Sequence, residues 1–204
     1  MAVKKELTDK EKKIAIIRKV LYLILFSLVI FCFIYLSNKY GYQEKTVKTI
    51  NDYYKNIDNT DMYETVNGTQ MINKIKNGCN IIVIGSETSD WSIKYMELIT
   101  PIFKTFAIDK VYYYDINNDK AQKNSNYYEI KELLKGNLTQ TDGSKSNLLA
   151  PSLYIIDNGE VKYYNTDTVA VKNTIEIEEY WNETRKNDFE IELEQAIYKY
   201  YLNN

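Results

Sequence analysis

The stretch GSETSDWSIK, residues 85–94, holds the pattern of side chains most able to do chemistry. It follows the apolar run NIIVIG, residues 80–85, which predicts a strand buried on both faces. It also opens an amphipathic helix expected over residues 90–107. Two serines stand at this junction, Ser89 and Ser92. A serine at a helix start either caps the helix or, beside a general base, acts as a nucleophile.

Capping fits these residue types better than nucleophilic chemistry. The chain has no histidine, which removes the usual general base, the usual zinc ligand and every Ser-His pair. Lys94 is the only lysine nearby. Ser89 is a good N-cap, Asp90 complements the helix dipole, and Ser92 can share the unpaired N–H groups of the first turn. We therefore expect no catalytic residue, no metal site and no cofactor.

Two further residue types near the junction leave alternatives open. Trp91 either lines a peptide-binding groove or is partly buried against the adjacent loop. Cys79 precedes the strand, away from the junction, so a small, partly buried side chain is the simpler interpretation than a redox thiol. The other cysteine, Cys32, falls in the most apolar segment, and pairing with Cys79 is not expected.

The N-terminal part predicts a membrane anchor. Residues 20–36 (VLYLILFSLVIFCFIYL) carry no charge, and we expect an uncleaved transmembrane helix over residues 20–37 rather than a buried helix or a signal peptide. Residues 1–19 carry seven Lys/Arg and residues 38–57 carry four. The positive-inside bias predicts a cytoplasmic basic tail over 1–19, a single pass through the cell membrane, and an extracytoplasmic C-terminal domain.

The outer part predicts an α/β domain. Residues 38–61 are expected as a helical stalk or linker, with apolar residues at helical spacing over 44–57. Residues 62–204 give the order helix, strand, helix, strand, helix, hairpin, helix, and the hairpin turns at Asn158-Gly159. This order predicts a central mixed sheet with helices on both faces. The net charge of residues 38–204 is −6, from nineteen Lys/Arg and twenty-five Asp/Glu, so no nucleic-acid partner is expected.

The element order resembles thioredoxin over roughly residues 62–202. The junction IGSETSDWSIK is most similar to the IGxxTCPxCxxF junction of bacteriocin-export accessory proteins, small thioredoxin-like proteins of Gram-positive bacteria that are often membrane-anchored. By this resemblance Ser89 stands at the attacking cysteine and Ser92 at the resolving cysteine. Ala150-Pro151-Ser152 resembles the cis-proline motif of the family, which implies a cis bond before Pro151.

The resemblance implies a degenerate redox site made of Ser89, Asp90, Trp91 and Ser92. It also implies peptide binding at Trp91, Ala150 and Pro151. A serine hydroxyl cannot form a disulfide, so the expected function is a redox-inactive accessory factor at the cell surface that binds a peptide or protein partner in bacteriocin export, maturation or immunity. Two alternatives stay open: a divergent thiol-disulfide oxidoreductase that uses Cys79 or thiols of a partner, and a structural subunit of a membrane secretion or conjugation complex.

Overall fold

A computed structural model describes residues 9–40, 49–54, 57–58, 60–142, 145–166 and 174–202. The chain divides into two compact units, Met1–Thr46 and Val47–Asn204.

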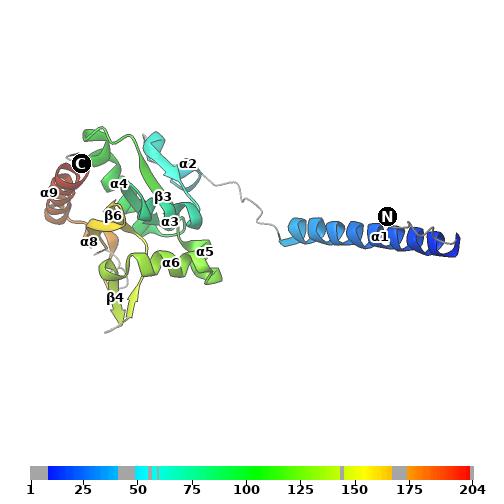
Figure 1. Cartoon of the computed structure of the whole chain (residues 1–204). Coiled ribbons are helices and arrows are strands. Elements are labelled where there is room, and N and C mark those ends of the chain that lie inside the picture. The colour runs from blue at the N-terminus through cyan, green and yellow to red at the C-terminus, as the bar shows by residue number, and fades with distance from the viewer. Residues whose placement is uncertain are drawn as a thin grey trace. The chain divides into compact units, whose positions relative to one another are not determined.

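The first unit contains one long helix, α1 (Asp9–Tyr40), drawn in Figure 1 as a continuous ribbon. It has no glycine or proline to interrupt it. Its described large apolar side chains, from Ile14 to Phe31, are all exposed. Side chains after Cys32 in this helix lie outside the described residues. In the part of the chain that the structure describes, no helix is both long enough and apolar enough to cross a bilayer.

The second unit is built on a five-stranded sheet in the order β1-β3-β2-β6-β7. Strands β1, β3 and β2 are parallel, and β6 and β7 are antiparallel to their neighbours. The hairpin between β6 and β7 turns at Asn158 and Gly159, both with positive φ, as the Asn-Gly signal predicts. The strands are β1 (Tyr63–Thr65), β2 (Cys79–Gly85), β3 (Val111–Asp115), β6 (Ser152–Asp157) and β7 (Glu160–Asn165).

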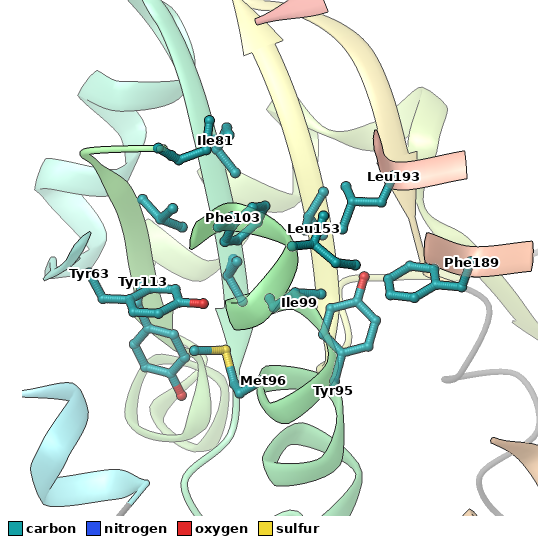
Figure 2. Packing of buried hydrophobic residues seen from close by; sticks show 14 of the residues in the cluster. Tyr63, Ile81, Tyr95, Met96, Ile99, Phe103, Tyr113, Leu153, Phe189 and Leu193 are labelled. Carbon is teal, nitrogen blue, oxygen red and sulfur yellow. The ribbon is translucent and has the colours of Figure 1, made fainter. Parts of the chain in front are cut away.

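Helices cover both faces of this sheet, as expected. Ile82 and Ile84 of β2 pack in one core with α3 (Gly68–Lys76) and α6 (Ser125–Leu133). The alternate residues Ile81 and Val83 pack in the other core with α4 (Asp90–Thr105) and α9 (Glu183–Tyr200). Figure 2 shows this second core, where Met96, Ile99 and Phe103 of α4 lie close to the sheet and Phe189 and Leu193 enter from α9. A strand buried on both faces needs apolar residues at successive positions, which explains the run NIIVIG.

Several shorter elements complete the domain. They are α2 (Ile50–Tyr53), η1 (Thr60–Met62), α5 (Asn117–Gln122), η2 (Lys135–Asn137), the small hairpin β4 (Thr139–Asp142) and β5 (Lys145–Asn147), and α8 (Ile177–Tyr180).

Part of the segment expected as a stalk is built into the domain. Residues 41–48 lie outside the described residues, and the helix expected over 44–57 is described only as the four residues of α2. Ile50 and Tyr54 are each 2% exposed and pack in the core with α4. The helical spacing of Ile50 and Tyr54 therefore buries both side chains in this core.

Candidate functional site

The junction between β2 and α4 lies at the carboxyl end of the central strand. Ser89 is the N-cap of α4, with an extended backbone, as predicted. Its carbonyl oxygen accepts hydrogen bonds from the N–H groups of Ser92 (2.9 Å) and Ile93 (3.0 Å). The Ser89 hydroxyl makes no capping hydrogen bond. The backbone rather than the side chain of Ser89 thus ties this helix end.

Ser92 faces the interior of the domain. It is fully buried, whereas Ser89 is half-buried and Asp90 is exposed. The Ser92 hydroxyl oxygen accepts a hydrogen bond from the Ser86 N–H (3.1 Å). It also interacts with the hydroxyl of Tyr54, which comes from the end of α2. The hydroxyl of Ser92 is therefore already hydrogen-bonded within the domain.

A pair of buried tyrosines continues this polar chain. The hydroxyl oxygens of Tyr54 and Tyr113 are 2.7 Å apart, and the rings meet edge-on at 5.7 Å between centroids. Burial raises the pKa of both phenols well above its ordinary value. Both phenols therefore stay protonated at physiological pH, and a protonated phenol is too weak a base to take the proton of Ser92.

The loop before α4 is fixed to the end of β3 by Asp115. One carboxylate oxygen accepts from the Glu87 N–H (3.0 Å) and the other from the Asn117 N–H (2.7 Å). The Ser86 hydroxyl donates to Asn117 Oδ1 at 3.0 Å. The sequence interpretation missed these residues. They could have been found from the pairing of two parallel strands, whose carboxyl ends meet at the same edge of the sheet. In that pairing Gly85 lies beside Asp115.

The proline motif lies beside the same edge. The Ala150–Pro151 peptide bond is cis, as the resemblance implies. Ile84 pairs with Ser152, so the antiparallel register brings Pro151 to the end of β2 that leads into α4. Ala150 and Pro151 are both buried. Peptide binding by these two residues stays a prediction.

Trp91 follows the burial interpretation rather than the open-groove interpretation. It is 8% exposed and packs edge-on against Tyr180 of α8, with ring centroids 5.5 Å apart. Tyr95, one turn later, packs against Trp181 and Phe189, and Figure 2 shows Tyr95 facing Phe189. Tyr180 and Trp181 thus cover the first turns of α4, and Trp91 offers little surface for a peptide.

A cleft of about 680 Å³ opens beside this aromatic cluster. Ser89, Ser92 and Pro151 are not among its lining residues. The cleft is formed by the end of β7, the end of α8 and the first turns of α9. Its lining residues are Asn165, Tyr180, Trp181, Asn182, Glu183, Thr184, Arg185, Asp188, Phe189 and Glu192.

The cysteines lie away from the junction. Cys79 is the first residue of β2, and Gly85 is the last, so the two ends are roughly 20 Å apart at the ordinary rise of a strand. The Cys79 thiol lies 3.5 Å from the carbonyl oxygen of Tyr200. Neither Cys79 nor Cys32 forms a disulfide bond within the described residues. Among the described residues, no three His, Cys, Asp or Glu side chains are placed to hold a metal ion.

The arrangement agrees with the family that the sequence resembles. Three parallel strands followed by an antiparallel hairpin, a helix that begins at the end of the central strand, and a cis-proline beside that helix start are all present. The domain has a thioredoxin-like fold. The start of α4 at the end of the central strand carries Ser89 and Ser92.

No family model and no curated protein matches the chain. Among solved structures it is similar to a protein described as having a thioredoxin fold, with 13% identity over 51% of this chain and 81% of that chain and a TM-score of 0.38. It is also similar to thioredoxin O2 from Arabidopsis thaliana, with 11% identity over 55% of this chain and 90% of that chain and a TM-score of 0.35. For thioredoxin f from spinach chloroplast the identity is 16% over 52% of this chain and 81% of that chain, and the TM-score is 0.29. These similarities are too distant to carry an argument, so the fold rests on strand order and direction.

Proposed function

We propose that this chain is a redox-inactive, membrane-anchored protein that uses its thioredoxin-like domain to bind a peptide or protein partner outside the cytoplasm. The observation that carries the proposal is the pair of hydroxyls at Ser89 and Ser92. Thiol-disulfide exchange needs a thiolate that attacks a disulfide sulfur, and a hydroxyl at either position cannot take part. Cys79, at the far end of β2, does not replace them.

The surroundings of these serines also disfavour hydrolytic chemistry. The Ser92 hydroxyl is buried and hydrogen-bonded to Ser86, and the adjacent phenols are neutral. Lys94, the nearby lysine, forms an ion pair with the carboxylate of Glu97 at 3.1 Å. The chain has no histidine, the usual base partner of a serine nucleophile. A binding role needs none of these groups to react.

The anchor belongs to the same proposal. The uncharged run over residues 20–36 and the exposed apolar side chains of α1 support contact with a bilayer through residues 20–37. Seven Lys/Arg over residues 1–19 support a cytoplasmic N-terminus and an outer domain. Bacteriocin export, maturation or immunity is the setting that we propose, because the junction over residues 84–94 resembles that of the accessory proteins of such systems.

The test is an insulin-reduction assay on the full chain in nanodiscs, with dithiothreitol as the reductant and thioredoxin as the positive control. We expect no reduction above the rate with dithiothreitol alone. The Cys79→Ser variant should behave identically. Clear turnover that disappears in Cys79→Ser would replace this proposal with a divergent oxidoreductase.

A further inference from the structure

Helix α9 carries exposed apolar side chains on the side opposite its buried face, among polar ones. Its inner face is the expected core stripe, with Phe189, Leu193, Ala196 and Ile197 buried. On the opposite face Ile191 is 53% exposed and Tyr198 is 62% exposed, and seven residues, or about two helical turns, separate them. Leu202, 47% exposed, follows in the turn that closes the helix. Ile191, Tyr198 and Leu202 are called the outer stripe below.

The core of the domain does not explain the outer stripe. A helix that covers a sheet needs one apolar face, and its solvent face is normally polar. Single exposed apolar residues are ordinary on a protein surface, but aligned ones mark a contact site. Figure 1 shows α9 on the outside of the domain, with the sheet on one side of it. The outer stripe is thus a surface suited to another helix or chain.

Carboxylates border the outer stripe on both sides. Asp188 and Glu192 lie one turn apart along one border, and Glu190 and Glu194 along the other. Within the described part of the chain, none of these four forms an ion pair. Like charges four residues apart repel each other on a helix. A cationic partner would relieve this repulsion.

Three basic residues of α9 contact other side chains of the same chain. Lys186 pairs with Glu183 at 2.8 Å. Arg185 donates to the Tyr180 hydroxyl at 2.7 Å and stacks over that ring, and Lys199 lies over the Tyr200 ring. The charge that α9 leaves unbalanced along the outer stripe is therefore negative.

The cleft lies along one border of the outer stripe and is lined by two of its carboxylates. Asp188 and Glu192 line it together with the rings of Tyr180, Trp181 and Phe189. The two carboxylates attract a lysine or arginine side chain by ion pairing. The rings are buried and offer little surface for a further cation. Arg185 of the same chain already lies over the Tyr180 ring.

We propose that the outer stripe and its bordering carboxylates dock a basic amphipathic helix of a partner protein. Its apolar face would cover Ile191, Tyr198 and Leu202, and its lysines or arginines would pair with the carboxylates. A second copy of this chain would oppose one row of carboxylates with another, and an anionic lipid surface would repel them. This surface goes beyond the proposed function, because it uses neither the Ser89–Ser92 junction nor its lack of redox activity.

The test measures the affinity of the full chain, in nanodiscs of zwitterionic lipid, for a fluorescent helical peptide made only of leucine and lysine. The leucines repeat at every third and fourth position, and the signal from empty nanodiscs is subtracted. We expect at least about tenfold weaker binding for Ile191→Ser with Tyr198→Ser, and for Glu190→Gln with Glu194→Gln. Circular dichroism checks that each variant is folded, and the charge variant keeps the test informative if the stripe variant unfolds.

The controls separate this surface from general stickiness. Tyr128→Ser and Glu132→Gln change an exposed tyrosine and an exposed carboxylate on α6 and should leave the affinity unchanged. A scrambled leucine/lysine peptide and a leucine/glutamate helix should bind weakly. Equal affinity of wild type and both α9 variants would overturn the proposal. So would an equally tight leucine/glutamate helix. A dimer that Ile191→Ser with Tyr198→Ser dissociates, with unchanged peptide affinity, would assign the surface to a second copy instead.

Discussion

The hydroxyl oxygens of Tyr54 and Tyr113 lie 2.7 Å apart in the core, next to Ser92. Tyr54 comes from the segment before the first strand, and Tyr113 comes from β3. Their contact joins the end of α2 to β3, beneath the start of α4. Buried hydrogen bonds between side chains and backbone of the domain itself therefore surround Ser92.

Tyr113→Phe should destabilise the domain by about 1–3 kcal/mol, because it leaves the buried Tyr54 hydroxyl without its 2.7 Å partner. Tyr54→Phe should cost a similar amount. The double variant should cost less than the sum of the two, since it removes both polar groups together. Urea unfolding followed by fluorescence measures these values. Tyr128→Phe, on an exposed ring, is the matched control, and additive losses would show that the two hydroxyls are not coupled.

Stability should fall at alkaline pH because buried tyrosines must stay neutral. Burial raises the pKa of Tyr154 to about 12, and it also raises the pKa values of Tyr54, Tyr63 and Tyr113. Below pH 10, the ordinary tyrosine value, these groups are protonated in both states and the stability is fully present. Above it the unfolded chain loses protons first, so the free energy of unfolding decreases.

Tyr154→Phe should reduce this alkaline loss. One such tyrosine contributes a slope of about 1.4 kcal/mol per pH unit between its unfolded and folded pKa values. Urea midpoints between neutral pH and pH about 11 would measure the difference from wild type. Tyr128→Phe is again the control. An unchanged slope in Tyr154→Phe would mean that this phenol ionises in the folded state as easily as in water.

Asp115→Ala should loosen the loop that leads into α4. The change removes the acceptor of two backbone N–H groups, those of Glu87 and Asn117, and should cost about 1–3 kcal/mol. Amide hydrogen exchange should speed up at Glu87 and Asn117 before it does so in the centre of the sheet. Asp109→Ala, an exposed carboxylate in the loop before β3, is the control. Protection at both amides that survives Asp115→Ala would show that other contacts fix the loop.

Membrane topology gives a separate prediction. Because residues 1–19 are more basic than residues 38–57, a C-terminal tag should lie outside the cytoplasm. Protease added to intact cells should remove the tag, while a cytoplasmic marker protein stays whole. A tag that is cut only after the membrane is broken would contradict the proposed orientation.

Local patterns were enough to predict the central elements. The run NIIVIG indicates a strand because buried parallel strands need apolar residues on both faces. Asn158-Gly159 indicates a hairpin because both residues tolerate positive φ. The residue types Ser89 and Asp90 indicate the start of α4 at the right place, although the Ser89 side chain makes no capping hydrogen bond. Each of these signals lies within a few residues of the element that it predicts.

Contacts between distant segments were harder to predict. Strand β1 has three residues, too few for a periodic pattern, and α5 has no apolar stripe. The burial of Trp91 depends on Tyr180, which lies far along the chain. Tyr54 lies in the segment expected as a stalk, and only its tertiary partner Tyr113 shows why it is buried. The outer stripe on α9 is hard to separate from the core stripe until exposure is known.

The most direct test of the proposed degenerate redox site is to place two cysteines at Ser89 and Ser92. Ser89→Cys with Ser92→Cys, in a Cys32→Ser, Cys79→Ser background, places two thiols on the first turn of α4, where residues three apart are neighbours. The helix start lowers the pKa of a thiol at residue 89, although Asp90 opposes this. Thiol alkylation with mass spectrometry after mild oxidation is expected to show one intramolecular disulfide in the folded protein. Two free thiols under oxidant, in a domain that remains folded, would contradict the thioredoxin-like geometry of this junction.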